Sequence, residues 1–528
     1  MQRKLKLGIV SLFWMIVMIA AALPASAAGT VVGLLQDVSP KSSVSVPAGK
    51  TVKLRALAAS GAAVTATVNG QTVTLTATDQ EEDGGVWYQG TYTVPKAAGG
   101  TSLGSISFTA KSGSRTETRV GGVVNVAEKN VTVEVDPPAD DNKEPVSGDM
   151  VVVKPDYAEI YSIDDRGEEY AAPYYYNLPK GTIDYVVGST KTCYDLKSGR
   201  RIAKTNVTSL GSGTKGNNTV SSVKVKNDGT YTTLTIKQTW NVPFNLTPTP
   251  VKYEKSTSNT VTSCVPTAVI LTFDYTTDFP ASRISFPRNS AFKSASWKKV
   301  TTNGIPQVQL QLELSQEGGY YGAYAKYDAS GNLVLTFLNP VDSLDGARIV
   351  IDPGHGTDDP GNSGSGFYES ILNLQKAQAL KKELEARGAE VYMLNTNGGK
   401  RLDLYTRTDL ATDWMPHVFV SVHHNWADNT SARGVEVFYN TPYSQRLAKY
   451  VCDELYEAYR DMPNGSGARN RGDKFSEFAV NRPKQFASIL VEYGFLSNKD
   501  ELSICVDESY NEAFAEATAN GIEAFFAG

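Results

Sequence analysis

Residues 349–356 read Ile349-Val350-Ile351-Asp352-Pro353-Gly354-His355-Gly356, and this stretch decides the fold of the last third of the chain. A short apolar run ends here in Asp-Pro-Gly, directly before a histidine. Two later apolar runs end in the same way, one at His423 and the other at Glu492. If these runs form one parallel sheet, the three side chains meet at its carboxyl edge, where open α/β sheets bind their ligands.

Strand-like and helical patterns alternate from residue 346 to residue 528. A helical pattern begins at Glu369 and ends at Arg387, with Gly388 as its stop signal. The other segments are strands over 390–394, 418–422, 434–439 and 488–492 and helices over 444–459 and 510–526. This alternation predicts one α/β domain over 346–528, with a mostly parallel sheet flanked by helices.

Four side chains of this domain form a candidate metallohydrolase site, namely His355, Glu369, His423 and Glu492. Catalytic zinc is held by imidazole and carboxylate ligands and keeps one position open for water, and His355, Glu369 and His423 fit those roles. A second carboxylate, Glu492, fits the general acid/base that moves the proton of a zinc-activated water. Each residue alone also has an ordinary explanation. A histidine at a strand end is more often structural, and a glutamate at a helix start favours the helix dipole.

Five motifs follow one another in this region: Asp-Pro-Gly-His-Gly at 352–356, a helix-opening Glu369, Ser-x-His-x-Asn at 421–425, Asn-Arg-Gly at 470–472 and Val-Glu-x-Gly-Phe-x-Ser-Asn at 491–498. With them, residues 348–497 resemble the zinc-dependent N-acetylmuramoyl-L-alanine amidases of the type 3 family. The resemblance implies that His355, Glu369 and His423 hold Zn²⁺ and that Glu492 is the catalytic carboxylate. It also implies hydrolysis of the amide bond between the lactyl group of N-acetylmuramic acid and L-alanine of the stem peptide.

The sequence departs from the family pattern at two places. The family usually has a small residue after its ligand histidine, where this chain has His424. That side chain could touch substrate, donate a hydrogen bond behind the metal, or face the other side of the strand, which alternation along a strand favours. Leu394-Asn395-Thr396-Asn397-Gly398 stands where the family often shows Thr-Arg-x-x-Asp, although the later Leu404-x-x-Arg407 element is retained. We expect an altered surface loop there and altered substrate contacts, with catalysis kept. A structural role is expected for His417.

The first residues carry a targeting signal. Arg3, Lys4 and Lys6 precede an apolar run that reaches Leu23, and Ala-Ser-Ala follows at 25–27. This pattern predicts a secretory signal peptide over 1–27, with an uncleaved membrane anchor as the alternative. No later segment is apolar enough to span a membrane. We therefore expect a secreted, monomeric protein associated with the cell wall, whose partner is peptidoglycan.

The segments before residue 346 are rich in strand patterns. Two strand-like runs flank Asn69-Gly70, a strong hairpin signal, and predict an immunoglobulin-like β-sandwich over 30–135. A proline-containing linker over 136–149, an SH3-like β-barrel over 150–205 and a β-rich domain over 206–345 follow. For the three tyrosines at 174–176, ordinary strand positions are favoured over a stacking surface for glycan or peptide.

Charge and cysteine content limit the function further. A net charge of −5 gives no support for nucleic-acid binding. Export would permit disulfides between Cys193 and Cys264 and between Cys452 and Cys505, but the sequence leaves both pairings open. None of the four cysteines has C-x-x-C spacing, so a cysteine-based zinc site is not expected.

Two other functions compete with a wall amidase. One is a wall-binding or adhesion protein whose amidase-like domain has lost activity, and the four intact key residues argue against it. The other is a zinc peptidase or deacetylase that acts on another wall bond. The Asp-Pro-Gly-His-Gly and Val-Glu-Tyr-Gly-Phe elements argue against this second alternative.

Overall fold

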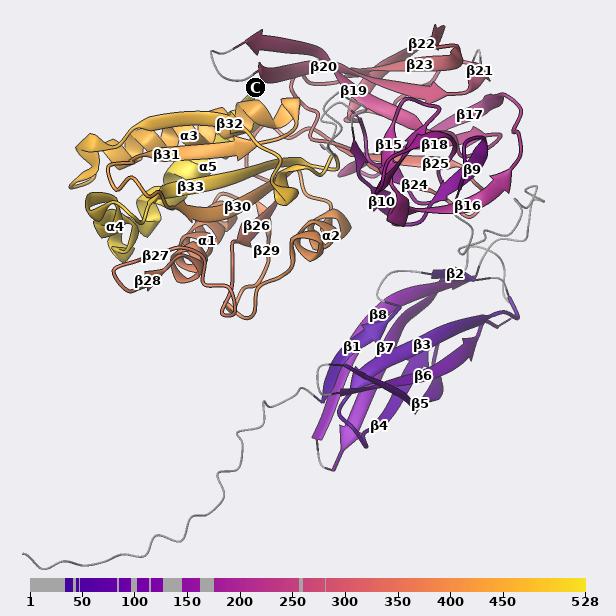
Figure 1. Ribbon diagram of the computed structural model, residues 1–528, viewed down its shortest axis with the longest axis horizontal. Coiled ribbons are helices and arrows are strands. Elements are labelled where there is room, and N and C mark those ends of the chain that lie inside the picture. The colour runs from indigo at the N-terminus through magenta and orange to yellow at the C-terminus, as the bar shows by residue number, and fades with distance from the viewer. Residues whose placement is uncertain are drawn as a thin grey trace, which may run out of the picture. The chain divides into compact units, whose positions relative to one another are not determined.

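The computed structural model describes residues 34–40, 44–46, 48–82, 85–95, 102–113, 115–126, 145–161, 175–255, 260–280 and 282–528. The chain forms two compact units, Met1–Asn130 and Val131–Gly528, which we describe separately (Figure 1). The predicted signal peptide, most of the predicted linker and Tyr174 lie outside the described residues.

The first unit is built from strands alone. They are β1 (Leu35–Ser39), β2 (Val44–Val46), β3 (Thr51–Ala58), β4 (Ala63–Val68), β5 (Gln71–Glu82), β6 (Gly85–Thr93), β7 (Ser102–Ser112) and β8 (Arg115–Val126). They pair in the order β1-β3-β6-β5-β4-β7-β8-β2. The predicted hairpin is confirmed, because Val68 pairs with Gln71 across Asn69 and Gly70, both with positive φ. The immunoglobulin-like assignment stays a prediction.

The second unit begins with a six-stranded sheet in the order β11-β15-β14-β13-β9-β16. Its strands, together with the short pair β10 and β12, are β9 (Asp149–Val153), β10 (Tyr157–Ala158), β11 (Ile160–Tyr161), β12 (Leu178–Pro179), β13 (Ile183–Ser189), β14 (Cys193–Leu196), β15 (Arg201–Ala203) and β16 (Val207–Ser212). The SH3-like assignment of this region stays a prediction. Tyr176 is buried and donates a hydrogen bond from its hydroxyl to the carbonyl of Ala323 (2.6 Å), so it is a core residue.

Two further sheets follow in the second unit, in the orders β21-β17-β18-β25-β24 and β19-β20-β23-β22. Their strands are β17 (Asn218–Asn227), β18 (Tyr231–Gln238), β19 (Phe244–Lys255), β20 (Thr260–Asp274), β21 (Thr276–Asp278), β22 (Phe292–Thr302), β23 (Ile305–Leu314), β24 (Tyr324–Tyr327) and β25 (Leu333–Leu338). The β-rich character expected before residue 346 is thus confirmed. The predicted boundaries between the β modules stay predictions.

The C-terminal layer contains all the α-helices of the described residues (Figure 1). Its elements are β26 (Arg348–Pro353), β27 (Ser363–Gly364), β28 (Phe367–Tyr368), α1 (Glu369–Ala386), β29 (Glu390–Met393), α2 (Leu404–Trp414), β30 (Val418–Asn425), β31 (Val435–Tyr439), α3 (Gln445–Arg460), β32 (Asn470–Phe475), β33 (Ala487–Phe495), α4 (Lys499–Cys505) and α5 (Asn511–Ala527). The main sheet has the order β29-β26-β30-β33-β31-β32.

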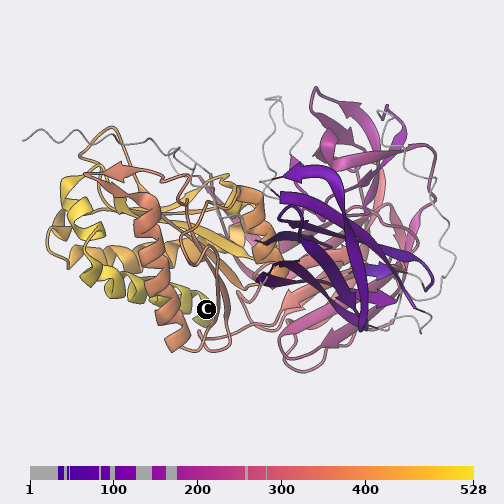
Figure 2. The same cartoon turned by 90° about the horizontal axis from the view of Figure 1, so that it is seen from below.

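This sheet is mixed, because β31 runs antiparallel to β33 while the other neighbours are parallel. Strands β26 and β30 carry continuous apolar runs because their side chains are buried almost throughout. Helix α5 packs against α1 and α3 over one face, and α2 lies apart from this group (Figures 1 and 2). Strand β26, which precedes His355, and the strands β30 and β33, which carry His423 and Glu492, are adjacent and parallel, as the site requires.

His417 joins the α/β layer to the preceding β region. It is buried, its Nδ1 accepts a hydrogen bond from the backbone N–H of Arg348 (3.0 Å), and its Nε2 lies 3.1 Å from the carbonyl of Asn339. Because Nδ1 accepts, Nε2 carries the proton and donates to Asn339. The structural role expected for His417 is confirmed.

The disulfides that the sequence left open are not formed. Cys264 is a buried thiol that donates to the carbonyl of Pro250 (2.9 Å), so it does not bridge to Cys193. Cys452 and Cys505 are buried thiols, and Cys452 contacts Asn470 through Sγ (3.3 Å). A buried free cysteine packs like a small apolar residue and its S–H group is a weak hydrogen-bond donor, so these thiols are stable without forming disulfides.

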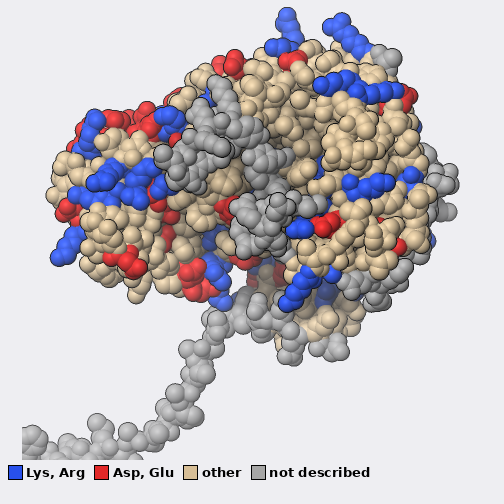
Figure 3. All heavy atoms as spheres, turned by 45° about the horizontal axis from the view of Figure 1, so that its top comes forward, with Lys and Arg blue, Asp and Glu red and all other residues tan. Residues whose placement is uncertain are grey.

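The face drawn in Figure 3 shows no single dominant charge. On the face drawn in Figure 3, basic and acidic side chains are interspersed over a mostly uncharged surface, in keeping with a net charge of −5. Within the described ranges, no helix combines the length and apolar character needed to cross a membrane.

Candidate metal centre

The candidate site begins at the carboxyl ends of three neighbouring strands. β26 ends at Pro353, two residues before His355, and β30 carries His423. His423 is the register partner of Glu492 on β33, and Pro353 is the partner of Val422. The backbone N–H of Gly354 donates to the carbonyl of Val422 (3.0 Å), which fixes the turn that presents His355. The sheet thus brings residues far apart in sequence to one edge.

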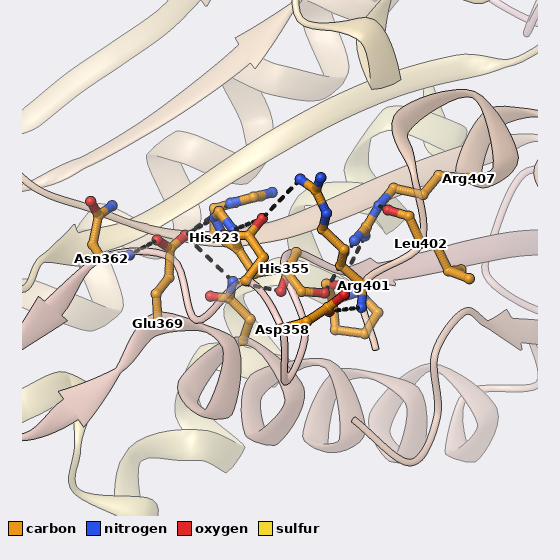
Figure 4. A network of polar contacts seen from close by, with 12 residues as sticks. His355, Asp358, Asn362, Glu369, Arg401, Leu402, Arg407 and His423 are labelled. Atoms are coloured by element: carbon orange, nitrogen blue, oxygen red, sulfur yellow. Dashed lines mark hydrogen bonds and ion pairs between the residues drawn. The ribbon is translucent and has the colours of Figure 1, made fainter. Parts of the chain in front are cut away.

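Three of the four predicted residues converge on one point, as Figure 4 shows. Ligand atoms of His355, Glu369 and His423 all lie within 4.8 Å of one another. Glu369 Oε1 lies 2.9 Å from His423 Nδ1 and 3.3 Å from His355 Nε2. Two ligands at ordinary zinc distances and a tetrahedral angle are separated by about 3.4 Å. The donors therefore fit a tetrahedral metal ion after small adjustments.

Two glycines allow this close approach. A Cβ at Gly354 would stand 2.2 Å from the ring of His423, and a Cβ at Gly361 would stand 2.6 Å from Glu369 Oε2. Gly361 also has a φ of +68°, which disfavours any other residue. A larger residue at either glycine would therefore collide with His423 or Glu369.

Asp359 sets the orientation of His355. Its carboxylate lies 3.1 Å from His355 Nδ1 and can accept a hydrogen bond from it, while Nε2 lies 3.3 Å from Glu369 Oε1; with the proton on Nδ1, the Nε2 lone pair would be left for a metal ion. This carboxylate–histidine arrangement is the usual support behind a metal-binding imidazole. Burial lowers the pKa of His355, but hydrogen bonds and charges from Glu369 and Asp359 outweigh burial and raise it.

Glu369 is held as a carboxylate. It is 1% exposed, and it accepts hydrogen bonds from the backbone N–H groups of Asn362 (2.8 Å) and His424 (3.2 Å). Burial would raise its pKa, but the hydrogen bonds and charges of His355 and His423 hold the pKa well below its usual range. Its position at the start of α1 adds the favourable end of the helix dipole.

Arg407 clamps the loop that carries His355 (Figure 4). It is 4% exposed and reaches from α2 to the carboxylate of Asp352 and to the carbonyls of Pro353 (3.0 Å) and His355 (3.1 Å). Ser421 donates to the other oxygen of Asp352 (2.9 Å). The retained Arg407 element thus has a physical purpose, because one guanidinium fixes the whole Asp352–His355 turn.

Glu492 stands beside the three ligands. Its Oε2 has no hydrogen-bond partner among the described residues. Burial, then the charges of Glu369 and Glu436, raise its pKa well above the usual value, whereas Lys474 lowers it. A carboxyl group with a raised pKa suits proton transfer near neutral pH.

His424 faces away from the open side of the site, as alternation predicted. It is fully buried, its Nδ1 lies 2.8 Å from Asn373 Oδ1, and Asn373 Nδ2 lies 3.4 Å from Glu369 Oε1. Because Asn373 donates through Nδ2, its Oδ1 accepts from His424. The histidine therefore supports Glu369 through Asn373 and is closed off from solvent.

Three supporting residues escaped the sequence interpretation, namely Asp359, Asn373 and Glu436. Asn373 lies four residues after Glu369 on the same helix face, a spacing that could have indicated their contact. Asp359 follows His355 in a loop, where sequence spacing gives no such signal. Glu436 lies opposite Glu492 in the strand register, and only the strand pairing reveals this.

The fold and the convergent donors describe an α/β domain whose three side chains could hold a metal ion. The family model described as N-acetylmuramoyl-L-alanine amidase matches residues 349–524. Together with the relatives below, this match shows that the chain belongs to the N-acetylmuramoyl-L-alanine amidase family.

The chain is similar to the following two relatives and to one solved structure. The chain is 27% identical to N-acetylmuramoyl-L-alanine amidase LytC of Bacillus subtilis over 63% of this chain and 66% of LytC. It is 30% identical to the uncharacterized protein YqiI of the same organism, over 35% of this chain and 86% of YqiI. A crystal structure of an N-acetylmuramoyl-L-alanine amidase from Clostridium difficile 630 shares 30% identity, covers 34% of this chain and 97% of its own, and has a TM-score of 0.32.

Proposed function

We propose that this protein is an exported, wall-associated and monomeric peptidoglycan hydrolase. It cleaves the amide bond between the lactyl group of N-acetylmuramic acid and L-alanine of the stem peptide. The convergence of His355, Glu369 and His423 within 4.8 Å, beside the carboxyl group of Glu492, carries this proposal. Family membership supports the choice of bond.

The three convergent residues would hold Zn²⁺. Two neutral imidazoles and one carboxylate are the donor set of many catalytic zinc sites, and they leave one position for water or substrate. A bound zinc ion would supply a Lewis acid that acidifies water and polarises the scissile carbonyl. His355 is fixed in the tautomer that suits this task by Asp359, and Glu369 is fixed by two backbone N–H groups.

Glu492 has the proton-transfer role. Its carboxyl group takes the proton from the attacking water and delivers it to the amine of L-alanine as the amide bond breaks. Its raised pKa makes it easier for this carboxyl group to hold the transferred proton before passing it on. Arg407 and His424 act behind the site, by holding the His355 turn and the Glu369 carboxylate in place.

The proposal includes the modular organisation. A secretory signal over 1–27, a β-sandwich over 30–135, a linker over 136–149, an SH3-like barrel over 150–205 and a β-rich domain over 206–345 would precede the catalytic domain at 346–528. The β modules would keep the enzyme near the wall.

Digestion of purified peptidoglycan tests the proposed bond. The mature protein is incubated with the wall polymer, with and without a chelator, and the fragments are identified by mass. We expect peptides with free L-alanine amino termini and glycan strands with unsubstituted lactyl groups, and we expect neither product with the chelator. Cleavage of glycan bonds or of peptide bonds within the stem would refute the proposal.

A further inference from the structure

A cavity of about 430 Å³ lies beside His355, on the side of β26 and β29. Its other walls come from the start of α1 and from the loop after β29, and they include Tyr368, Ser370, Ile371, Leu374, Asn395 and Gly398. No lysine, arginine, aspartate or glutamate lines it. Apolar side chains and neutral hydrogen-bonding groups therefore surround whatever enters this cavity.

The loop after β29 is a fixed wall of the cavity. Asn395 and Gly398 both have positive φ, and Gly398 lies so close to α1 that a Cβ there would stand 2.7 Å from Leu374 Cδ2. The backbone N–H of Thr357 donates to the carbonyl of Gly399 (3.0 Å), which joins this loop to the His355 turn. Residues 395–398 read Asn-Thr-Asn-Gly and are uncharged, so this wall brings no charge to the cavity.

The opposite side of the site is cationic. Glu436, the register partner of Glu492, binds Arg471 through Nε (2.6 Å) and also binds Lys474. Two cations around one carboxylate leave a net positive charge. The side chains of Arg471 and Lys474 are 32% and 35% exposed, so both can also meet a ligand.

The strand order arranges these features in a line. From β29 to β32 the sheet edge presents the uncharged cavity, His355, His423, Glu492, and then the cluster of Glu436, Arg471 and Lys474. A substrate that lies along this edge therefore meets a neutral end and a cationic end, with the reacting groups between them.

We propose that substrate binds in one direction along this edge. The N-acetylated sugar occupies the cavity beside His355, and the stem peptide extends past Glu492 toward Arg471 and Lys474. This inference rests on the proposed function, and two independent arguments agree on the direction. Glu492, the proton donor to the leaving amine, lies on the peptide side, and the acidic groups of a stem peptide are complementary to the cationic cluster.

The chemistry of an acetamido group matches the cavity. Its methyl group can pack against Ile371 and Leu374, and its amide can bond to Ser370, Asn395 or the loop backbone. Such mixed walls, with a few polar groups among apolar ones, are typical of small-molecule pockets. A sugar with a free, protonated amine would find no counter-charge on the cavity walls.

The first experiment concerns the peptide end. Soluble peptidoglycan strands of several disaccharides are prepared with stem peptides that carry either D-glutamate or its uncharged amide, D-isoglutamine. We expect kcat/KM to be about two- to fivefold higher for the acidic stem, as for an exposed ion pair. Lys474→Gln and Arg471→Gln should abolish this preference, and the charge-conserving Lys474→Arg should retain it. An equal or reversed preference in the wild-type enzyme would refute the direction.

The second experiment concerns the sugar end. The same strands are compared before and after removal of the N-acetyl groups. Ile371→Glu places a carboxylate at the cavity and should lower the preference for the N-acetylated strand by about fivefold, whereas the matched Ile371→Gln should not. An identical preference in both variants would refute the assignment of the sugar. If the wild-type enzyme frees no L-alanine amino termini from any strand or from whole peptidoglycan, the proposed function itself would be overturned.

Discussion

His423 and Glu492 are register partners on the adjacent parallel strands β30 and β33, so one pair of strands carries both a candidate metal ligand and the candidate proton carrier. Their relative position is thus set by the hydrogen bonds of the sheet, which is more rigid than a loop. Glu369 and His355 approach the same point from α1 and from the turn after β26.

Gly354→Ala tests how tightly the ligands are packed. The new Cβ would stand 2.2 Å from the ring of His423, so the imidazole must shift from its position beside Glu369. We expect zinc affinity, measured by competition with a chelating dye, to fall by about 100-fold. Gly216→Ala is the control, because a Cβ at Gly216 meets nothing within 4 Å. Unchanged affinity in Gly354→Ala would contradict the site geometry.

Arg407→Lys tests the clamp on the His355 turn. Lysine keeps the charge but cannot reach Asp352 and the carbonyls of Pro353 and His355 together. We expect zinc affinity to fall by about 10- to 100-fold and the melting temperature to drop. The matched control is Arg401→Lys, whose exposed side chain lies 3.4 Å from Asp359. Equal behaviour of the two variants would argue against a clamp.

The buried His417 should make the stability of the fold sensitive to acid. Burial lowers its pKa to about 4, while an unfolded histidine titrates near pH 6.5. Because the pKa of His417 is lower in the folded protein than in the unfolded chain, its contribution to the free energy of unfolding is complete above pH 6.5. This contribution is lost as the pH falls toward 4. The loss reaches about 3 kcal/mol.

Melting temperatures between pH 4 and 8 measure this effect. The difference in melting temperature between the wild type and His417→Gln should shrink steadily as the pH falls from 6.5 to 4. The wild type loses the stabilisation by neutral His417 over this range, whereas glutamine does not titrate. A difference that stays constant over this range would exclude His417 as its source. His424 is also buried with a lowered pKa, but it is common to both proteins and cancels.

His424 and Asn373 should act as one unit. His424→Ala leaves Asn373 Oδ1 without its donor, and Asn373→Ala removes the amide that contacts Glu369. Each change should lower zinc affinity by about tenfold. Because both break one chain of contacts, the double variant should be little worse than either single one. Fully additive losses would indicate that the two residues do not cooperate.

The sequence was a good guide wherever one local pattern carried the information. The apolar runs before His355, His423 and Glu492 predicted the three adjacent strands, and Gly388, with a φ of +91°, ends α1 as expected. Alternation along β30 correctly predicted that His424 faces away from the open side of the site.

The remaining features depend on long-range pairing. Helix α2 begins at the N-cap Asp403 in a sequence with weak apolar periodicity, and β32 is a polar strand, so neither was predicted. The antiparallel β31 and the contact of Glu436 with the Glu492 strand follow from the strand order, which no local pattern encodes. The two disulfide pairings that the sequence left open are not formed, and a shared domain alone could not have decided them.

Reconstitution with zinc tests the central claim most directly. Chelated wild-type protein and Glu492→Gln are titrated with Zn²⁺, and metal content and the appearance of free L-alanine amino termini in peptidoglycan digests are followed together. We predict one zinc ion per chain in both proteins, full recovery of activity in the wild type, and activity lower by about 10²- to 10⁴-fold in Glu492→Gln. Wild-type activity that survives complete metal removal, or a fully active Glu492→Gln, would contradict the account.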